Sequence, residues 1–216
     1  MKIKKNKPVI IIGSGGHSKV LIDILIETKR NILGVTDPNK KKGDKHYGFN
    51  IIGTDAEIFK FSNKEIELVN GIGLNSKKKS NLNLTKKFMK CGYIFSKVIH
   101  PSSYISKSVL LGDSVQIMPG VIINANVRID HSVLINTKSS IDHDCHIQHG
   151  CHIAPGAILC GNVNVGKYTH IGAGTVIIEN IKIGDNCLIA AGTVVYKNIQ
   201  SGTKYIQVKK DIFTKN

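Results

Sequence analysis

The sequence predicts two domains of different class, an α/β domain followed by an all-β parallel β-helix. Three observations predict this division. The second half repeats an aliphatic residue every six positions, the first half shows a strand, a glycine turn, a helix and a second strand, and the six-residue period is absent before about residue 95. We therefore assign residues 1–95 to the first domain, 96–200 to the β-helix and 201–216 to a C-terminal tail.

The repeat of the second half is the most specific signal. Ile, Leu or Val occupies each of the 17 positions reached from Ile99 to Val195 in steps of six, and turn formers such as Pro-Gly and Gly-Asp recur between them. This period is typical of the left-handed parallel β-helix, in which three hexapeptides make one triangular coil. Residues i and i+18 then stack on neighbouring coils, about 4.8 Å apart.

A second row, two residues before the aliphatic row, holds small or β-branched side chains. It includes Cys145, Cys151 and Cys187, which we interpret as packing residues that point inward. The chain has five cysteines and no Cys-x-x-Cys pair, which favours a reducing compartment over a disulfide framework.

The first half reads as a Rossmann-like α/β domain. Apolar runs predict strands near residues 8–13, 31–37 and 66–73, with helices after the first and third. Gly13, Gly15 and Gly16 lie in the turn between the first strand and its helix, where backbone amides can approach a phosphate. Asp37 ends the second strand and suits a ribose or base hydroxyl. Ser18 replaces the third glycine of a dinucleotide fingerprint, which favours a nucleotide sugar over NAD.

The net charge and the hydropathy of the chain limit the classes of partner that the protein can bind. The formal net charge is +15, and the lysines gather in predicted loops such as KIKKNK and NKKKGDK. These loops are either ordinary solvated surface or a source of positive potential that attracts anionic ligands. No DNA-binding motif accompanies this charge, so we expect no nucleic-acid partner. The apolar stretch PVIII is too short for a signal peptide and no run approaches a membrane span, so we expect a cytoplasmic protein without a membrane partner.

Motifs from both halves together resemble the NeuD/PglD-type sugar acetyltransferases, which include UDP-4-amino-sugar N-acetyltransferases and sialic acid O-acetyltransferases. They are IIGSGGHSKV, VTD, MPGVIINANVRI, IDHDC, LCGNV and IGAGTVI. The resemblance implies a homotrimer that transfers acetyl from acetyl-CoA, its co-substrate, to the amine of a nucleotide-linked 4-amino-4,6-dideoxy sugar. UDP is the implied nucleotide, and surface glycan or nonulosonic acid biosynthesis the implied setting. Acetylation of a hydroxyl on sialic acid or another sugar is the alternative.

The resemblance also implies site residues. In IDHDC it assigns the catalytic base to His143 and the following acid to Asp144, where the family usually has Glu. It assigns the amide that contacts the thioester carbonyl to Gly161. The remaining implied contacts are, for the nucleotide sugar, His17, Asp37, Gly73 and Asn136 and, for coenzyme A, His152, Gly161, Ala173 and Ala191. The tail SGTKYIQVKKDIFTKN departs from the GVPAK-like ending that is common in the family.

The repeat geometry is compatible with direct acetyl transfer. Gly161 follows His143 by 18 residues and should stack on it, with Asp144, or less favourably Asp142, fixing the imidazole. Cys145 lies on the inward row, which argues against a covalent acyl-enzyme. His152 is half a coil away, so we expect it to meet His143 only across a subunit interface.

The other histidines are predicted to stack on the surface in pairs, His131 with His149 and His152 with His170, while His146 has no assigned role. A zinc site of the γ-carbonic-anhydrase kind is the first rival interpretation, but no two histidines are five residues apart, so no metal is expected. A non-enzymatic scaffold is the second rival, against which the glycine turn and the IDHDC motif argue.

Overall fold

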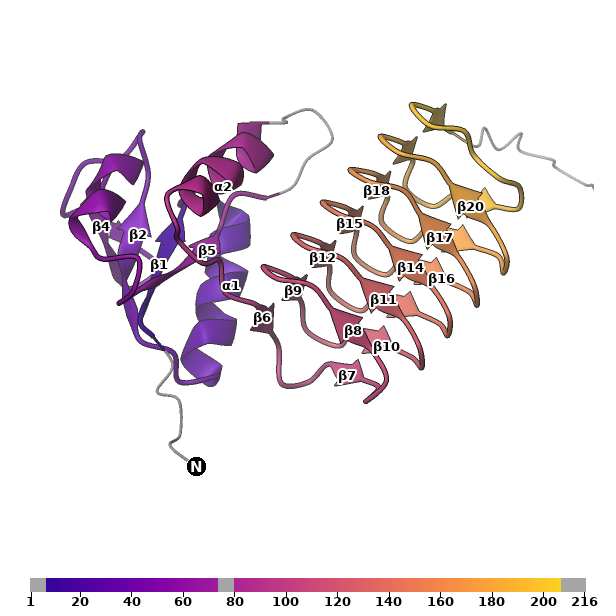
Figure 1. Ribbon diagram of the computed structural model, residues 1–216, viewed down its shortest axis with the longest axis horizontal. Coiled ribbons are helices and arrows are strands. Elements are labelled where there is room, and N and C mark those ends of the chain that lie inside the picture. The colour runs from indigo at the N-terminus through magenta and orange to yellow at the C-terminus, as the bar shows by residue number, and fades with distance from the viewer. Residues whose placement is uncertain (1–6, 74–79, 207–216) are drawn as a thin grey trace, which may run out of the picture.

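The computed structural model describes residues 7–73 and 80–206. The N-terminal domain packs against the first coils of a parallel β-helix, whose later coils extend away from it (Figure 1). The predicted fold class is therefore confirmed. In the described part of the chain, no helix is long and apolar enough to cross a membrane.

The N-terminal domain contains a five-stranded sheet of order β3-β4-β2-β1-β5. Its strands are β1 (Val9–Ile12), β2 (Ile32–Thr36), β3 (Lys45–His46), β4 (Phe49–Gly53) and β5 (Glu67–Asn70). The sheet is parallel except at one edge, where β3 pairs antiparallel with β4. Tyr47 and Gly48, which join the two, both have positive φ angles, 47° and 85°, as in the tight turns that match strand twist in hairpins.

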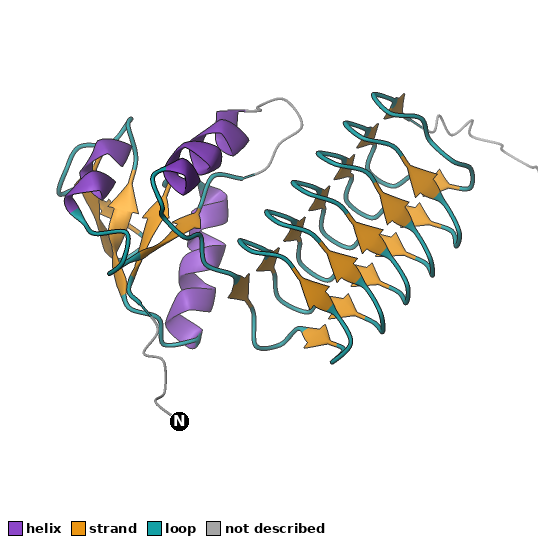
Figure 2. Ribbon diagram, viewed as in Figure 1, coloured by secondary structure: helices purple, strands orange, loops and turns teal. Residues whose placement is uncertain are grey.

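Helices cover both faces of this sheet (Figure 2). The α2 helix (Ser80–Lys90) and the 3-10 helix η1 (Asp55–Lys60) pack on one face. The α1 helix (Gly16–Glu27) covers the other, and its buried Leu21, Ile22 and Leu25 belong to an apolar cluster that includes Met118 and Leu134 of the β-helix. The α1 helix therefore connects the two domains through a shared core.

The β-helix has three parallel sheets, in which paired strands are 18 residues apart, except for the last pair of one sheet, where Leu188 pairs with Lys204, 16 residues on. The sheet that faces α1, called here the domain-facing sheet, contains β6 (Val98–Ile99), β9 (Gln116–Ile117), β12 (Leu134–Ile135), β15 (His152–Ile153), β18 (His170–Ile171), β21 (Leu188–Ile189) and β23 (Lys204–Tyr205).

The two other sheets differ in the side chains on their outer surfaces. The apolar-faced sheet contains β7 (Tyr104–Ile105), β10 (Ile122–Ile123), β13 (Ser140–Ile141), β16 (Ile158–Leu159), β19 (Val176–Ile177) and β22 (Val194–Val195). The polar-faced sheet contains β8 (Leu110–Leu111), β11 (Arg128–Ile129), β14 (His146–Ile147), β17 (Asn164–Val165) and β20 (Lys182–Ile183).

The predicted inward rows form the core of the β-helix. Ile123, Ile141 and Ile147 are fully buried, and each such side chain contributes roughly 1.5–3 kcal/mol. Cys145, Cys151 and Cys187 are buried among them, which confirms that they point inward. The interior of the β-helix is therefore uniform along its length, whereas the residues in the turns between the sheets differ from coil to coil.

Two rows of turns matter for the site. The Asn136 corner, between the domain-facing and apolar-faced sheets, comprises residues 136–139, 154–157, 172–175 and 190–193. The His143 corner, between the apolar-faced and polar-faced sheets, comprises residues 124–127, 142–145 and 160–163. In the His143 corner, Asn126, Asp144 and Asn162 have φ angles of 59°, 59° and 57°. Asn and Asp tolerate this left-handed conformation better than other residues with a Cβ.

Candidate functional site

The structure places the predicted site residues in three groups. One surrounds the glycine turn before α1, the second lies at the Asn136 corner, and the third lies at the His143 corner. The first two groups share a side of the molecule, because α1 packs on the domain-facing sheet.

The glycine turn leaves an open space before α1. Gly15 is the N-cap of the helix and has no side-chain capping hydrogen bond, and a Cβ at Gly15 or Gly16 would meet nothing within 4 Å. Gly13 has a φ of 93°, which disfavours any other residue. Exposed amides at a helix N-terminus suit an anion such as a phosphate.

Asp37 follows β2 and closes the other side of this turn. Its Oδ2 accepts hydrogen bonds from the backbone N–H of Ser14 at 3.0 Å and from the Ser14 hydroxyl at 2.5 Å. Its Oδ1 accepts one from the Asn39 N–H at 2.9 Å. Burial alone would raise the pKa of Asp37, but the hydrogen bonds from Ser14 and Asn39 bring it below its ordinary value. An ionised Asp37 thus holds the turn in shape beside the space where a ligand would bind.

Ser18 fills the position where a third glycine was expected. Its hydroxyl donates to the Gly15 carbonyl at 2.6 Å, and Nε2 of His46 lies 2.8 Å from the same hydroxyl. A Cβ at Gly71 would lie 2.8 Å from the Ser18 Cβ, so the missing glycine is compensated at Gly71. Gly73 lies beside His17, where an added Cβ would be 3.6 Å from the His17 Cβ.

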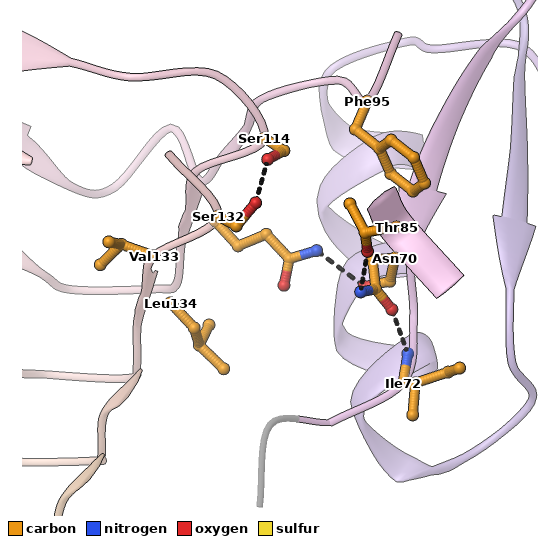
Figure 3. A pocket seen from close by; sticks show the side chains of 9 residues that line it. Asn70, Ile72, Thr85, Phe95, Ser114, Ser132, Val133 and Leu134 are labelled. Carbon is orange, nitrogen blue, oxygen red and sulfur yellow. Dashed lines mark hydrogen bonds between the residues drawn. The ribbon is translucent and has the colours of Figure 1, made fainter. Parts of the chain in front are cut away.

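His17 lies at the interface between the domains. Its Nε2 is 2.7 Å from Oε1 of Gln116, whose amide nitrogen donates to the Asn70 carbonyl at 2.7 Å. Desolvation by burial lowers the pKa of His17, so the ring is neutral at pH 7. Thr85 and Leu134 line the cavity beside this contact (Figure 3). Gln116 was missed from the sequence, although it is a polar residue in the outward row of its sheet.

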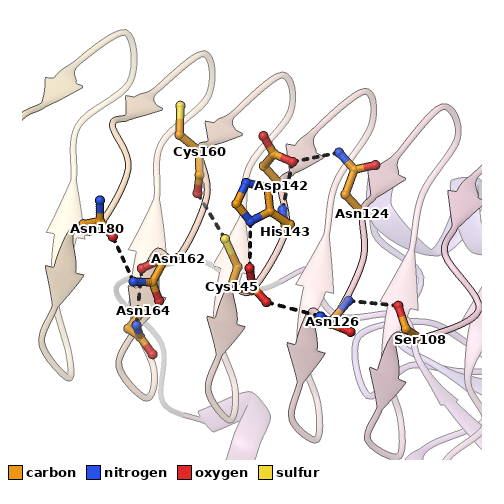
Figure 4. Close-up of polar contacts among 11 residues, drawn as sticks. Ser108, Asn124, Asn126, Asp142, His143, Cys145, Cys160, Asn162, Asn164 and Asn180 are labelled. Atoms are coloured by element: carbon orange, nitrogen blue, oxygen red, sulfur yellow. Dashed lines mark hydrogen bonds and ion pairs between the residues drawn. The ribbon is translucent and has the colours of Figure 1, made fainter.

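At the His143 corner, the imidazole of His143 is paired with Asp144. Nδ1 of His143 lies 2.8 Å from Oδ2 of Asp144, and the two side chains are 59% and 53% exposed. Asp142 instead accepts the backbone N–H of His143 at 2.8 Å (Figure 4). Because a carboxylate only accepts, Nδ1 carries the proton and Nε2 is left to accept one. The hydrogen bond to Asp144 raises the pKa of His143 above its ordinary value.

Gly161 lies directly against this imidazole. A Cβ added to Gly161 would lie 2.6 Å from Cε1 of His143, so only glycine leaves the ring in place. Among the described residues, none accepts a hydrogen bond from the Gly161 N–H. Cys145, which follows Asp144, is buried, and its thiol donates to the Cys160 carbonyl. Burial raises the pKa of this thiol to about 11. The corner therefore offers a base and a free amide, and its buried thiol is a poor nucleophile.

The Asn136 corner presents a second polar group. The amide nitrogen of Asn136 lies 3.2 Å from Nε2 of His152, and the rings of His152 and His170 meet edge to face with centroids 4.7 Å apart. Ala173 and Ala191 are exposed on the following coils of the same corner. The two corners border opposite edges of the apolar-faced sheet, so one chain does not bring His143 and His152 together.

The remaining histidines lie apart from both groups. His131 and His149 are neighbours on adjacent coils as predicted, with their rings edge to face and the centroids 6.4 Å apart, and His146 pairs with Asp130 at 3.2 Å. Within residues 7–73 and 80–206, no three His, Cys, Asp or Glu side chains are grouped so that they could hold a metal ion.

Comparisons with known proteins agree with this architecture. Residues 8–83 match the family described as PglD N-terminal domain, and residues 94–207 match the family described as GMPPB C-terminal domain. A variant of perosamine N-acetyltransferase from Caulobacter crescentus, solved with CoA and GDP-perosamine, is 30% identical, has a TM-score of 0.85, and is matched over 94% of this chain and 97% of that chain. The acetyltransferase domain of PglB from Neisseria gonorrhoeae FA1090, solved with acetyl coenzyme A, is 26% identical, has a TM-score of 0.83, and is matched over 92% and 95%. No curated protein sequence gives a significant match.

Proposed function

The chain belongs to the family of PglD-type sugar N-acetyltransferases, enzymes that use acetyl-CoA, and on this premise we propose its acceptor and mechanism. The proposed acceptor is the amine of a nucleotide-linked 4-amino-4,6-dideoxy sugar. UDP is the proposed nucleotide, and GDP is the alternative because the Caulobacter relative was solved with GDP-perosamine. The observation that supports this proposal best is the exposed His143–Asp144 pair set against Gly161.

The proposed reaction is direct transfer. Nε2 of His143 accepts a proton as the sugar amine attacks the acetyl carbonyl carbon, and Asp144 holds the ring in the required tautomer. The N–H of Gly161 donates to the carbonyl oxygen as negative charge develops there. The carbon–sulfur bond then breaks, and His143 returns the proton to the coenzyme A sulfur. The products are the acetamido sugar and coenzyme A.

We also propose a homotrimer, supported by the outer surface of the apolar-faced sheet. Five of its six outward residues are apolar, and Tyr104, Ile122 and Ile158 are at least 44% exposed. Apolar surface of this extent is typical of an interface. If this sheet faces a threefold axis, the His143 corner of one chain meets the Asn136 corner of the next. His143 and Gly161 would then face Asn136 and His152 of the neighbour, with coenzyme A running past Ala173 and Ala191.

Light scattering tests the trimer. The variant Ile158→Lys should convert the wild-type trimer to a monomer with normal secondary structure, because a buried lysine without a partner charge is costly. Asn164→Lys, which points outward from the polar-faced sheet, is the matched control and should remain a trimer. A wild-type monomer, or a trimeric Ile158→Lys variant, would contradict the interface.

An acceptor panel tests the reaction. Coenzyme A release should be measured with UDP-4-amino sugars, with a GDP-4-amino sugar, and with free and CMP-activated sialic acid. We expect turnover of UDP-linked amines by the wild-type enzyme, and turnover about 10³-fold slower by the His143→Asn variant. If sialic acid is the only acceptor that is acetylated, O-acetylation replaces N-acetylation as the proposed reaction. If none of the tested acceptors is acetylated, the scaffold interpretation remains.

We propose the cytoplasm as the location of the protein. All five cysteines are free, which agrees with a reducing compartment.

A further inference from the structure

The coil that precedes His143 carries two asparagines directly beneath the two acids that flank it. Asn124 stacks on Asp142, Ala125 on His143, and Asn126 on Asp144, each 18 residues apart. The asparagine on either side of Ala125 contacts an aspartate, and Figure 4 shows the contact between Asn124 and Asp142.

Asn126 contacts the carboxylate that pairs with the imidazole. Its amide nitrogen donates to Oδ1 of Asp144 at 3.4 Å, while Oδ2 of Asp144 pairs with His143. Asn126 is itself held from the coil below, because its backbone N–H donates to the Ser108 hydroxyl at 2.9 Å. Within the described residues, the only side chains that donate to the Asp144 carboxylate are those of His143 and Asn126.

The coil on the other side makes no such contact. Asn162 occupies the same turn position above Asp144, with nearly the same φ, 57° against 59° for Asn126. Its amide nitrogen donates away from the site, to Oδ1 of Asn180 at 2.9 Å. The ladder of side-chain hydrogen bonds is therefore interrupted at Asp144, whose second oxygen stays directed at His143.

The backbone of His143 is fixed independently of Asn126. Its N–H donates to Asp142, which Asn124 holds at 3.0 Å, and its carbonyl accepts from the Asn162 N–H at 2.9 Å. The two side chains of the His143–Asp144 pair are more than half exposed, so water competes for their hydrogen bonds. Asn126 therefore acts on the side chain of Asp144 and not on the fold of the corner.

We propose that Asn126 is a positioning residue, which orients the Asp144 carboxylate so that His143 Nε2 faces the acceptor amine. This inference rests on the proposed function, because it gives His143 the role of base. Asn126 touches neither substrate in this scheme and acts only through Asp144.

The test compares Asn126→Gly with Asn162→Gly. Glycine accepts a positive φ without strain, so both variants remove one amide and keep the turn. In Asn126→Gly we expect kcat to fall about three- to tenfold, the usual effect of one partly exposed hydrogen bond, with KM for both substrates unchanged. The pKa of His143, measured by NMR, should fall toward its ordinary value, because Asp144 is held less well. Asn162→Gly should leave both quantities at the wild-type level.

A second variant distinguishes the loss of the hydrogen bond that orients Asp144 from the loss of side-chain volume at position 126. Asn126→Asp keeps the size of the side chain but places a negative charge beside Asp144, so kcat should fall further than in Asn126→Gly. Equal kinetics of Asn126→Gly and Asn162→Gly, or wild-type kcat in Asn126→Asp, would overturn the proposal. The NMR titration needs no substrate. If no sugar is acetylated, the proposed function fails while the titration still tests whether Asn126 orients Asp144.

Discussion

The β-helix and the N-terminal domain place their site residues in different ways. In the β-helix, His143 occupies a turn position that holds Ala125 one coil earlier and Gly161 one coil later, and the backbone is the same in all three coils. The N-terminal domain makes each of its contacts once, as between Ser14 and Asp37 within the domain or between His17 and Gln116 of the β-helix. The stability of the repeating backbone therefore does not depend on the catalytic side chains that it presents. In the N-terminal domain, by contrast, the glycine turn and its partners both stabilise the domain and line its open space.

This comparison leads to a kinetic division. Substitutions of the groups in the His143 corner that contact the His143–Asp144 pair should lower kcat and leave stability unchanged, because this pair is exposed. Substitutions around the glycine turn should raise KM for the nucleotide sugar and lower stability as well.

The largest effect is expected at the base. His143→Ala should lower kcat about 10³-fold, a typical loss for a general base, while the melting temperature stays within a few degrees of the wild type. His146→Ala, three residues on and paired with Asp130, is the matched control and should retain activity. Steady-state kinetics and calorimetry check both variants. A fall in melting temperature equal to that of a core substitution would show that the corner is structural.

The next effect separates two glycines of the β-helix. In Gly161→Ala the new methyl meets only the tip of the His143 ring, so kcat should fall about 10²-fold at unchanged stability. In Gly172→Ala it would lie 2.4 Å from the backbone nitrogen of Ala191, which cannot move aside. That variant should lose about 1–3 kcal/mol of unfolding free energy.

Urea unfolding and kcat, measured on both glycine variants, test whether one substitution affects catalysis and the other stability. If Gly161→Ala is the less stable of the two and Gly172→Ala the less active, the division between chemistry and fold within the β-helix is wrong.

Much of the β-helix could be predicted because its repeat is redundant. Seventeen aliphatic positions at one spacing leave one architecture, and that architecture places Gly161 against His143. The choice between Asp142 and Asp144 was left open, since it depends on side-chain direction. Asn126 was also missed: a spacing of 18 identifies it as a neighbour of Asp144, but only coordinates show to which oxygen it donates.

The N-terminal domain was predicted less completely because its contacts occur once. The glycine turn and Asp37 follow from local pattern, but the strand pair β3–β4 is short and its turn lacks an Asn-Gly or Asp-Gly signal. His46 and Gln116 reach Ser18 and His17 across 28 and 99 residues, and no local pattern links such pairs. Where the sequence has no repeat, the spacing of residues does not predict which side chains are in contact, and only the tertiary structure shows these pairs.

A smaller effect is expected at Asp37. Asp37→Asn keeps the size of the side chain but weakens the hydrogen bonds that shape the turn, so KM for the nucleotide sugar should rise about tenfold. We expect kcat to change less than twofold. Asp44→Asn, in an exposed loop of the same domain, is the control. A fall in kcat with KM unchanged would place Asp37 in the chemical step and break the division.

The smallest effect concerns pH, because the pKa values of the two histidines are shifted in opposite directions from the ordinary value. The pKa of His143 is raised by Asp144, so kcat/KM should fall with decreasing pH from a midpoint above 6.5, as the base becomes protonated. The pKa of His17 is lowered by burial, so its contribution to stability is complete above the unfolded value of about 6.5 and is lost as the pH falls toward the folded value.

His17→Gln should therefore reduce the loss of unfolding free energy between pH 7.5 and 5.5 by about 1 kcal/mol or less. The reduction is partial because burial also lowers the pKa of His46, His149 and His170. His131→Gln, at an exposed ring, is the control. The midpoint of the kcat/KM profile should stay where it is in both variants, because the charges that act on His143 belong to Asp142 and Asp144. If His17→Gln moves that midpoint, the glycine-turn region takes part in setting the base, and binding and chemistry are coupled through the Gln116 contact.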